Sequence, residues 1–228
     1  MKVRVASGFS PAGYIEYGKA FLDSFHKFWP AAVDLVVYIE EPVAMPRGEC
    51  RSLWDCQGAR EFYVRHRDNP EYCGTKQNAL WKPRYHGRPY CFRYDAVKFF
   101  RQCMIPEAAT EGLVDGDVLA WLDGDVVTFA TPPADLIPRI LGEADIAFLG
   151  RKGSHSEIGF WAVRINERTR RFIGMFAQMW RTDLVFNLTE WHSAFVFDYC
   201  RRKVALAEKN LTPDGTRSEE RRVGKECL

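Results

Sequence analysis

The chain has 228 residues, of which 46% are hydrophobic and 14% aromatic, and its formal net charge is +2. A chain of this length and composition can bury one substantial core, so we expect a single domain. Charges of both signs are mixed along it without a long basic run, which argues against nucleic acid as the main partner. No apolar stretch approaches the ~20 residues that span a bilayer, and residues 1–5 start a strand and not a signal peptide. We therefore expect a cytoplasmic protein without an integral membrane segment.

The first elements alternate between strand and helix. Residues 2–6 and 33–39 are apolar runs typical of buried strands, whereas residues 14–28 carry apolar side chains at three- and four-residue steps, which predicts a helix with one face for a sheet. Residues 7–13 form the loop before this helix, and Pro30 ends it. A strand, a helix and a second strand at this spacing predict a parallel unit.

The middle of the chain is less regular. Residues 46–89 are rich in aromatic and charged side chains, and we interpret them as an excursion over the sheet edge with a helix over residues 59–67. An amphipathic helix is predicted over residues 92–104, with Lys98 and Arg101 on one side. The later elements are a helix over 134–141, strands over 145–149 and 159–164, and helices over 167–180 and 193–209.

These elements predict an α/β fold, in which a mixed, mostly parallel central sheet is flanked by helices in a single domain over residues 1–210. Residues 217–227 resemble the translation of a sequencing adapter, read through in frame. We therefore expect residues 211–228 to be a disordered or artefactual tail, and the natural C-terminus of the domain to be missing.

The most informative motif is Asp123-Gly124-Asp125, which directly follows the apolar run 119–122. That run is too short for a lone helix and predicts a central strand that is buried on both faces. Ligands of open α/β sheets lie at the carboxyl ends of the strands, and Mg²⁺ or Mn²⁺ held by one or two carboxylates keeps positions open for phosphates. The motif therefore predicts a metal and diphosphate site.

A polar turn is the alternative interpretation of this motif. Asp and Gly are common turn formers, and Asp115-Gly116-Asp117 fits that description. For residues 123–125 we favour the metal site, because Val126, Val127 and the two residues after them predict a chain that stays extended and does not turn back.

Several features in this order resemble the nucleotide-sugar-dependent glycosyltransferases of the GT-A type. They are the opening strand–helix–strand unit, the segment 92–98, the strand that ends in Asp123-Gly124-Asp125, and the segments 157–161 (EIGFW) and 191–193 (WHS). The resemblance covers residues 2–198 and depends on the order of the features, because none is specific alone. It implies a Rossmann-like GT-A fold and a transferase that moves a sugar from a UDP- or GDP-sugar to an unknown glycan or small-molecule acceptor.

The resemblance also implies roles for the two aspartates. Asp125 would ligate Mn²⁺ or Mg²⁺ directly, and Asp123 would contact the ribose or the metal. A cation that bridges the phosphates stabilises the charge on the leaving nucleoside diphosphate. His192 is the candidate for a histidine ligand to this metal, although many relatives take that histidine from a later segment.

The segment before the metal strand supplies candidates for nucleotide binding. Arg93 or Lys98 could reach a phosphate or Asp123, and Asp95 could hydrogen-bond to the base, the ribose or a basic neighbour. A solvated helix face is the alternative for each of them.

The loop after the first strand supplies further candidates, because such folds receive the nucleotide base there. It contains Ser7, Gly8 and Phe9, and either Phe9 or Tyr14 could stack on the base. Both aromatic side chains could instead belong to the core, which is the interpretation we prefer for Tyr14.

The candidates for acceptor chemistry lie late in the chain. An inverting transfer needs a carboxylate base near the acceptor hydroxyl, and Glu190, Asp198 and Glu157 could serve. We favour Glu190, because it lies at a loop-to-helix junction before Trp191, which could stack on a sugar ring. The alternative is that Glu190 only favours the helix N-terminus electrostatically.

Two other classes of protein remain as alternatives. A haloacid dehalogenase-type phosphatase would use Asp123 as nucleophile and Asp125 as acid/base, but that fold usually starts with the motif, whereas two predicted strands precede it here. A non-catalytic nucleotide-sugar-binding domain would share the site without turnover. A sugar-nucleotide pyrophosphorylase is disfavoured, because residues 7–13 contain no lysine or arginine.

Overall fold

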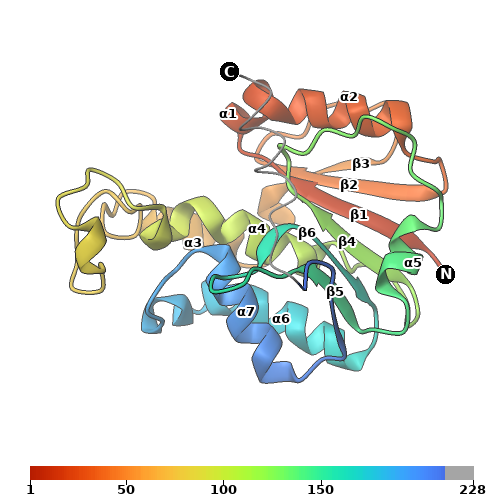
Figure 1. Cartoon of the computed structure of the whole chain (residues 1–228). Helices are drawn as coiled ribbons and strands as arrows, with labels where there is room; N and C mark the ends of the chain where they lie inside the picture. Colours follow the sequence, from red (N-terminus) through yellow and green to blue (C-terminus); the bar gives the residue numbers. More distant parts are fainter. Residues whose placement is uncertain (214–228) are drawn as a thin grey trace, which may run out of the picture.

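A seven-stranded sheet with the order β3-β2-β1-β4-β6-β5-β7 runs through the computed structural model, which describes residues 1–213 (Figure 1). Neighbouring strands are parallel except where β6 meets β4 and β5, so the predicted mixed, mostly parallel sheet is confirmed. The adapter-like residues 217–227 lie outside the described part of the chain. The strands are β1 (Val3–Gly8), β2 (Val33–Ile39), β3 (Glu49–Ser52), β4 (Val118–Leu122), β5 (Ile146–Leu149), β6 (Glu157–Arg164) and β7 (Glu208–Asn210).

Helices lie on both faces of the sheet, so the fold is the predicted α/β class (Figure 1). The α-helices are α1 (Pro11–Gly13), α2 (Lys19–Phe28), α3 (Ala59–His66), α4 (Ala96–Ala108), α5 (Leu136–Leu141), α6 (Glu167–Arg181) and α7 (Ser193–Val204). A π-helical turn (Tyr14–Gly18) joins α1 to α2, and short 3₁₀ turns occur at Leu53–Asp55, Pro83–Tyr85, Phe92–Tyr94 and Leu184–Asn187.

Each face of the sheet belongs to its own hydrophobic cluster. On the side of α2 and α5, the cluster includes Phe21 and Phe25 from α2 and Leu141 from α5. On the side of α4, α6 and α7, the largest buried side chains include Trp161 and Trp180. All five residues of β4 are buried, as expected for a strand covered on both faces. The sheet therefore presents solvent mainly at its edges and at its strand ends, where ligands can reach it.

The predicted parallel unit at the start of the chain is confirmed. β1 and β2 pair in parallel, from Val3 opposite Val33 to Gly8 opposite Tyr38. The strand ends two residues later than predicted, because Ser7 and Gly8 continue the ladder that was expected to end at Ala6. The connecting helical segment also begins earlier, at Pro11, since the Ser10 side chain caps it.

The segment 46–89 does more than cross over the edge of the sheet. Glu49–Ser52 forms β3, which pairs in parallel with β2 and lies at one end of the strand order, while the helix expected over 59–67 is confirmed as α3. No apolar alternation marks β3 in the sequence, because its side chains are exposed or half-buried. Its place in the sheet depends on backbone pairing and not on a buried apolar face, and the sequence pattern therefore does not reveal it.

The helix predicted to begin at Phe92 begins at Ala96. Phe92–Tyr94 is a separate 3₁₀ turn, and the Oδ1 atom of Asp95 accepts a hydrogen bond from the Lys98 backbone N–H at 2.8 Å. Asp95 is therefore the N-cap of α4, since its carboxylate satisfies one of the backbone donors that a helix start leaves unpaired.

The last predicted helix, over 193–209, is too long. α7 ends at Val204, because Ala205 has a left-handed backbone with φ of 54° and reverses the chain. Glu208–Asn210 then forms β7, which pairs in parallel with β5, and the Leu211 backbone N–H donates to the Phe148 carbonyl at 2.8 Å. The remaining predicted elements are present with shifted ends.

An arm projects from the body of the molecule between α3 and α4, in yellow in Figure 1. Its base is held by backbone hydrogen bonds from Cys91 to Gly74 and from Ala96 to Tyr72, both at 2.8 Å. Among residues 1–213, no helix is both long enough and apolar enough to span a bilayer.

Candidate active site

Asp123 and Asp125 lie directly after the carboxyl end of β4, the strand that follows α4 in the chain. Asp123 is half-buried, and its Oδ1 atom accepts hydrogen bonds from Gln102 Nε2 at 2.6 Å and Trp121 Nε1 at 2.7 Å. Its backbone N–H donates to the Gly159 carbonyl of β6 at 2.9 Å. These contacts hold the Asp123 carboxylate in place, whereas Asp125 is exposed.

The chain after β4 does not stay extended as the sequence predicted. The Val126 backbone N–H donates to the Asp123 carbonyl at 3.1 Å and closes a turn around Gly124 and Asp125. Gly124 is required there, because a Cβ atom at this position would overlap the buried ring of Phe9. The motif is thus both a turn and a pair of carboxylates at a strand end, and the two interpretations of the sequence do not exclude each other.

A cleft of about 270 Å³ opens beside this turn. Its acidic side is formed by Asp123 and Asp125, and its basic side by Lys98 and Arg101 from α4. Lys98 is exposed and has no carboxylate partner among residues 1–213, whereas Arg101 is held by Glu40 at the end of β2. One cleft therefore contains carboxylates that suit a divalent cation and an ammonium group that suits a phosphate.

The loop after β1 contributes to the cleft, although not through every residue that the sequence suggested. Gly8 and Phe9 line it, but Phe9 is only 1% exposed and packs edge-on against Phe21, with ring centroids 5.6 Å apart. Ser7 is fully buried, and its hydroxyl donates to the Leu122 carbonyl at 2.7 Å. Ser7 and most of the Phe9 ring therefore support the end of β4 and are not free to contact a nucleotide.

Tyr17 and Gln102 are two of the cleft-lining residues that the sequence did not indicate as site residues. Tyr17 was assigned to the apolar stripe of a helix, but the π-helical turn at its position brings it to the cleft. Burial raises the pKa of its hydroxyl, and Asp125 raises it further, so Tyr17 stays neutral and can donate a hydrogen bond. Gln102 was not singled out because a glutamine on an amphipathic helix carries no signal until its partner Asp123 is known.

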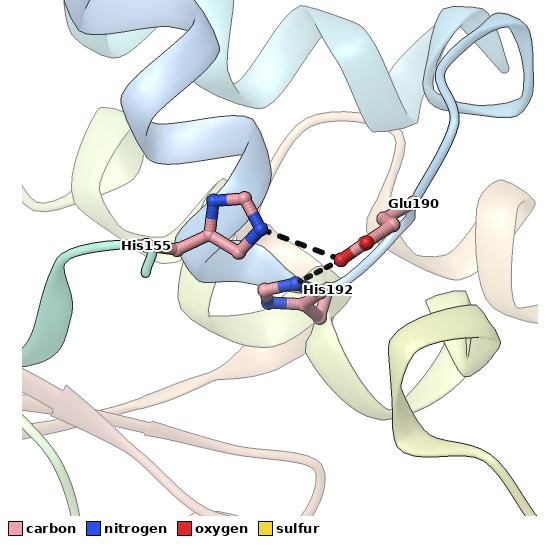
Figure 2. A group of neighbouring side chains, drawn as sticks. All are labelled: His155, Glu190 and His192. Atoms are coloured by element: carbon pink, nitrogen blue, oxygen red, sulfur yellow. Dashed lines mark hydrogen bonds and ion pairs between the residues drawn. The ribbon is translucent and has the colours of Figure 1, made fainter. Parts of the chain in front are cut away.

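A second group of side chains lies where α7 begins and is called the Glu190 cluster here: Glu190, His192, His155, Lys82 and Arg93. The Oε2 atom of Glu190 lies 2.9 Å from His192 Nε2 and 3.4 Å from His155 Nε2 (Figure 2). Lys82 and Arg93 form ion pairs with the same carboxylate. Glu190 itself is only 1% exposed, so its charge is balanced by these neighbours and not by water.

The electrostatics of this cluster argue against the base role proposed for Glu190. Burial alone would raise the pKa of the carboxyl, but the hydrogen bonds from His155, His192, Lys82 and Arg93 outweigh it and hold the pKa far below its usual range. A carboxylate with so low a pKa is a weak proton acceptor. The structure therefore favours a role for Glu190 in holding the four basic side chains in position.

His192 does not join the two aspartates as the sequence predicted for a metal ligand. Among the described residues, its side chain groups with His155 and Glu190, whose ligand atoms all lie within 4.8 Å of one another, and not with Asp123 and Asp125. Burial lowers the pKa of His192, while Glu190 opposes that change. A His-Glu-His set suits zinc in principle, but both oxygens of Glu190 are already occupied by Lys82 and Arg93, and a cation there would meet their charges.

Hydrogen bonds link the start of α7 to the turn after β4. The hydroxyl of Ser193, the first residue of α7, donates to Gln102 Oε1 at 2.5 Å, and the amide of the same glutamine donates to Asp123. Gln102 thus fixes the Asp123 carboxylate with one end of its side chain and the start of α7 with the other. This places the Glu190 cluster beside the cleft.

The other predicted site residues are distributed differently. Arg93 faces Glu190, and Asp95 is occupied as the N-cap of α4 and by Tyr90, whose hydroxyl donates to it at 2.9 Å. Asp198 is buried, accepts hydrogen bonds from the backbone and hydroxyl of Ser156 and pairs with Arg201, so it has a structural role. None of these three side chains lines the cleft.

Glu157 lies closer to Asp123 than the other two candidate carboxylates do. It forms an ion pair with Arg151, and its Oε1 atom accepts a hydrogen bond from the Gly159 backbone N–H at 3.3 Å. The same glycine faces Asp123, since a Cβ built on Gly159 would lie 3.5 Å from Asp123 Oδ2 and 3.6 Å from Glu157 Oε1. Of the three carboxylates considered for acceptor chemistry, Glu157 is the one that the structure brings next to Asp123.

Fold and site together define an α/β protein with a mostly parallel sheet and a mixed acidic and basic cleft at the carboxyl end of its central strand. No family model and no curated protein matches the chain. Among solved structures, it is similar to two of the glycosyltransferase GlyE from Streptococcus pneumoniae TIGR4, one of them the apo form, with 14% and 15% sequence identity and a TM-score of 0.47 for each. Each match covers 92% of this chain, which spans 45% of the length of the GlyE chain. The similarity concerns the course of the backbone, so the activity has to be argued from the site.

Proposed function

We propose that the chain is a glycosyltransferase that takes a sugar from a nucleoside-diphosphate sugar, with Asp123 and Asp125 holding Mn²⁺ or Mg²⁺. The observation that carries the proposal is the composition of the cleft, which these two carboxylates and Lys98 line together. Carboxylate oxygens suit hard divalent cations, and a cation of this kind is commonly completed by substrate phosphates. Diphosphate charge then needs balance from a second side, which Lys98 supplies.

The residues of this chain divide the work of binding. Asp125 is exposed and has no basic partner among residues 1–213, so it suits a direct ligand. Asp123 is held by Gln102 and Trp121, which fix the orientation of a carboxylate before any ligand arrives. When bound, the cation would stabilise the negative charge that develops on the leaving diphosphate. Tyr17 and Lys98 line the same cleft and can donate hydrogen bonds to phosphate or ribose oxygens.

The same contacts weigh against the phosphatase alternative. A nucleophilic Asp123 would need an exposed oxygen of high electron density, but Oδ1 accepts two short hydrogen bonds from neutral donors. Such bonds stabilise the carboxylate charge and reduce its nucleophilicity. A fixed ligand suits this environment better. Binding of a nucleotide sugar without turnover would use the same residues and differs from transfer only in the acceptor half of the site.

The test is a titration of the full-length chain with UDP, GDP and their sugars, with Mn²⁺ and with EDTA, followed by calorimetry and thermal unfolding. We expect binding that needs the metal and is lost in Asp125→Ala but kept in Asp23→Ala, an exposed aspartate on α2. Removing a side chain that hydrogen-bonds to a metal ligand typically weakens metal binding by roughly 10-fold to 100-fold, so loss of a direct ligand should cost at least as much. Binding that survives both Asp125→Ala and EDTA would contradict the proposal, as would the absence of nucleotide binding with any metal.

A further inference from the structure

The arm between α3 and α4 has an unusual distribution of charge. Residues 72–94, called the basic arm here, contain five lysines and arginines and one histidine but no aspartate or glutamate, in a chain whose acidic and basic residues are nearly balanced overall. Lys76 is partly neutralised by Glu71, which lies just before the basic arm. The positive charge of the basic arm is therefore concentrated around Lys82, Arg84, Arg88 and Arg93.

Three of these arginines surround one aromatic ring. The guanidinium carbons of Arg84, Arg88 and Arg93 lie 4.9, 5.5 and 5.9 Å from the centroid of Tyr85. Cation–π contacts of this kind orient the planar guanidinium groups while leaving their N–H donors at the edges available. Tyr85 is half-buried and packs against the core of the molecule, so it is a fixed platform for the three arginines.

The arginines of this group differ in their partners. Arg93 is 16% exposed and is committed to Glu190. Arg84 and Arg88 are exposed, and neither has a carboxylate partner within residues 1–213. Each of these two guanidinium groups is a planar fork of N–H donors without an acidic partner, which matches the oxygens of a phosphate or a carboxylate.

Tyr85 and the three arginines around it lie beside the proposed active site. Lys82, three residues before Tyr85, forms an ion pair with one oxygen of Glu190, and Arg93 pairs with the other. Glu190 precedes α7, whose first residue Ser193 is linked through Gln102 to Asp123. One buried carboxylate thus pairs with two basic side chains, so a net positive charge remains around Glu190.

We propose that Arg84 and Arg88 bind an anionic group of the acceptor, a phosphate or a carboxylate, and so select an acidic acceptor. That the bound anion belongs to an acceptor rests on the proposed glycosyltransferase function, whereas the anion site itself does not. A membrane surface is a less suitable partner, because the guanidinium groups are gathered around Tyr85 and not spread over a face, and Leu80, Tyr90 and Phe92 are only 40 to 43% exposed.

The test measures binding of glucose 6-phosphate, glucuronate and glucose to the full-length chain in EDTA, which removes any metal-dependent binding in the nucleotide cleft. We expect the phosphate, the carboxylate or both to bind and neutral glucose not to bind. In the variant R84Q/R88Q the affinity should fall by roughly tenfold or more, because each charged hydrogen bond that is lost is worth about that factor. The control R202Q/K203Q removes the same charge from the exposed side of α7 and should leave the affinity unchanged.

Three results would overturn the inference. They are equal binding of glucose and its acidic derivatives, equal weakening by R84Q/R88Q and R202Q/K203Q, and binding of the chain to phosphatidylglycerol vesicles without binding to the soluble anions. UDP and GDP binding with Mn²⁺ is measured in the same samples, because R84Q/R88Q leaves the nucleotide cleft intact. If the nucleotide binds and the acidic sugars do not, this inference fails alone; if neither nucleotide binds, the proposed function fails.

Discussion

At Glu190, one buried carboxylate faces four basic side chains, and this has a consequence for stability in acid. The pKa of the carboxyl lies far below its ordinary value of 4.5 in the folded chain, because the bonds from His155, His192, Lys82 and Arg93 outweigh the effect of burial. Its contribution to folding is therefore complete above about pH 4.5 and is lost as the pH falls below that value.

We predict that Glu190→Gln lowers the free energy of unfolding at about pH 7 by roughly 3 kcal/mol or more, since breaking a buried ion pair leaves its partners uncompensated. The difference between wild type and variant should shrink as the pH falls from about 5 to about 3, because the wild-type carboxyl then loses its advantage over the unfolded chain. Urea unfolding at several pH values measures both effects.

The control for Glu190→Gln is Glu143→Gln, at an exposed position in the turn after α5. It should change the free energy of unfolding little and equally at each pH. A difference between wild type and Glu190→Gln that stayed constant down to about pH 3 would show that the bonds to Glu190 do not depend on its charge.

The residues of the site were predictable to different degrees. Asp123 and Asp125 were predicted because they follow an apolar run directly, and the structure places both in one cleft with Lys98. His155, Lys82 and Gln102 were not predicted, because each depends on a partner that is distant in the sequence. His155 and Lys82 pair with Glu190, which is 35 or more positions away, and Gln102 donates to Asp123, which is 21 positions away. Such pairs have no spacing that a sequence pattern could reveal.

At the scale of elements, the strands and helices that carry apolar patterns were predicted and those that depend on backbone pairing were not. β2 was predicted with its observed ends, since all but one of its residues are buried. β3 and β7 occupy the two ends of the strand order and have no buried residue, so their polar sequences do not distinguish them from loops. The early start expected for α4 has a similar origin, because a 3₁₀ turn and a capping aspartate carry the same residues as a helical first turn.

The turn after β4 depends on Gly124, so the same substitution to alanine should have opposite effects on stability there and at a glycine within a helix. Gly124→Ala should lower the free energy of unfolding by about 1–3 kcal/mol, because its Cβ would overlap the buried Phe9 ring. Gly174→Ala, in the middle of α6, should raise the free energy of unfolding by about 0.5–1 kcal/mol, since the nearest atom to its Cβ is an ordinary 3.6 Å away and alanine favours a helix.

Urea unfolding of the two glycine variants measures both changes. Metal-dependent nucleotide binding should weaken in Gly124→Ala, which displaces the turn between the two aspartates, and should remain unchanged in Gly174→Ala. If Gly124→Ala were as stable as wild type and bound nucleotide equally well, the close packing of Phe9 on this turn would not be what orients the motif.

At the scale of the whole molecule, the sheet is completed by a short strand from the end of the described chain. β7 covers the edge of β5, Glu208 pairs with the buried guanidinium of Arg201, and the Thr212 hydroxyl donates to the Gly150 carbonyl at 2.5 Å. These few residues join the last helix to the loop that leads into β6, and so they connect parts of the chain that are about 60 positions apart.

We predict that a chain ending after Ala207 has a lower thermal midpoint than one ending after Pro213. The shorter chain loses the β5–β7 hydrogen bonds and the contact from Thr212, each worth about 1 kcal/mol, and exposes an edge of β5 that can pair with other copies. Thermal unfolding followed by circular dichroism, with light scattering for aggregation, makes the comparison. Equal midpoints and equal scattering would mean that β7 contributes nothing to the stability of the sheet.

The reversed direction of β6 separates the two halves of the site in the chain. The cleft beside Asp123 and Asp125 is lined by segments that follow or precede parallel strands, namely the loop after β1, α4 and the turn after β4. The other half enters through His155 in the segment before β6 and Glu157 at the start of β6, because only an antiparallel strand begins where its neighbours end. Under the proposed function, donor and acceptor recognition would therefore be modular: changes in the length and sequence of residues 150–156 would alter the surroundings of Glu190 without moving the turn that carries Asp123 and Asp125.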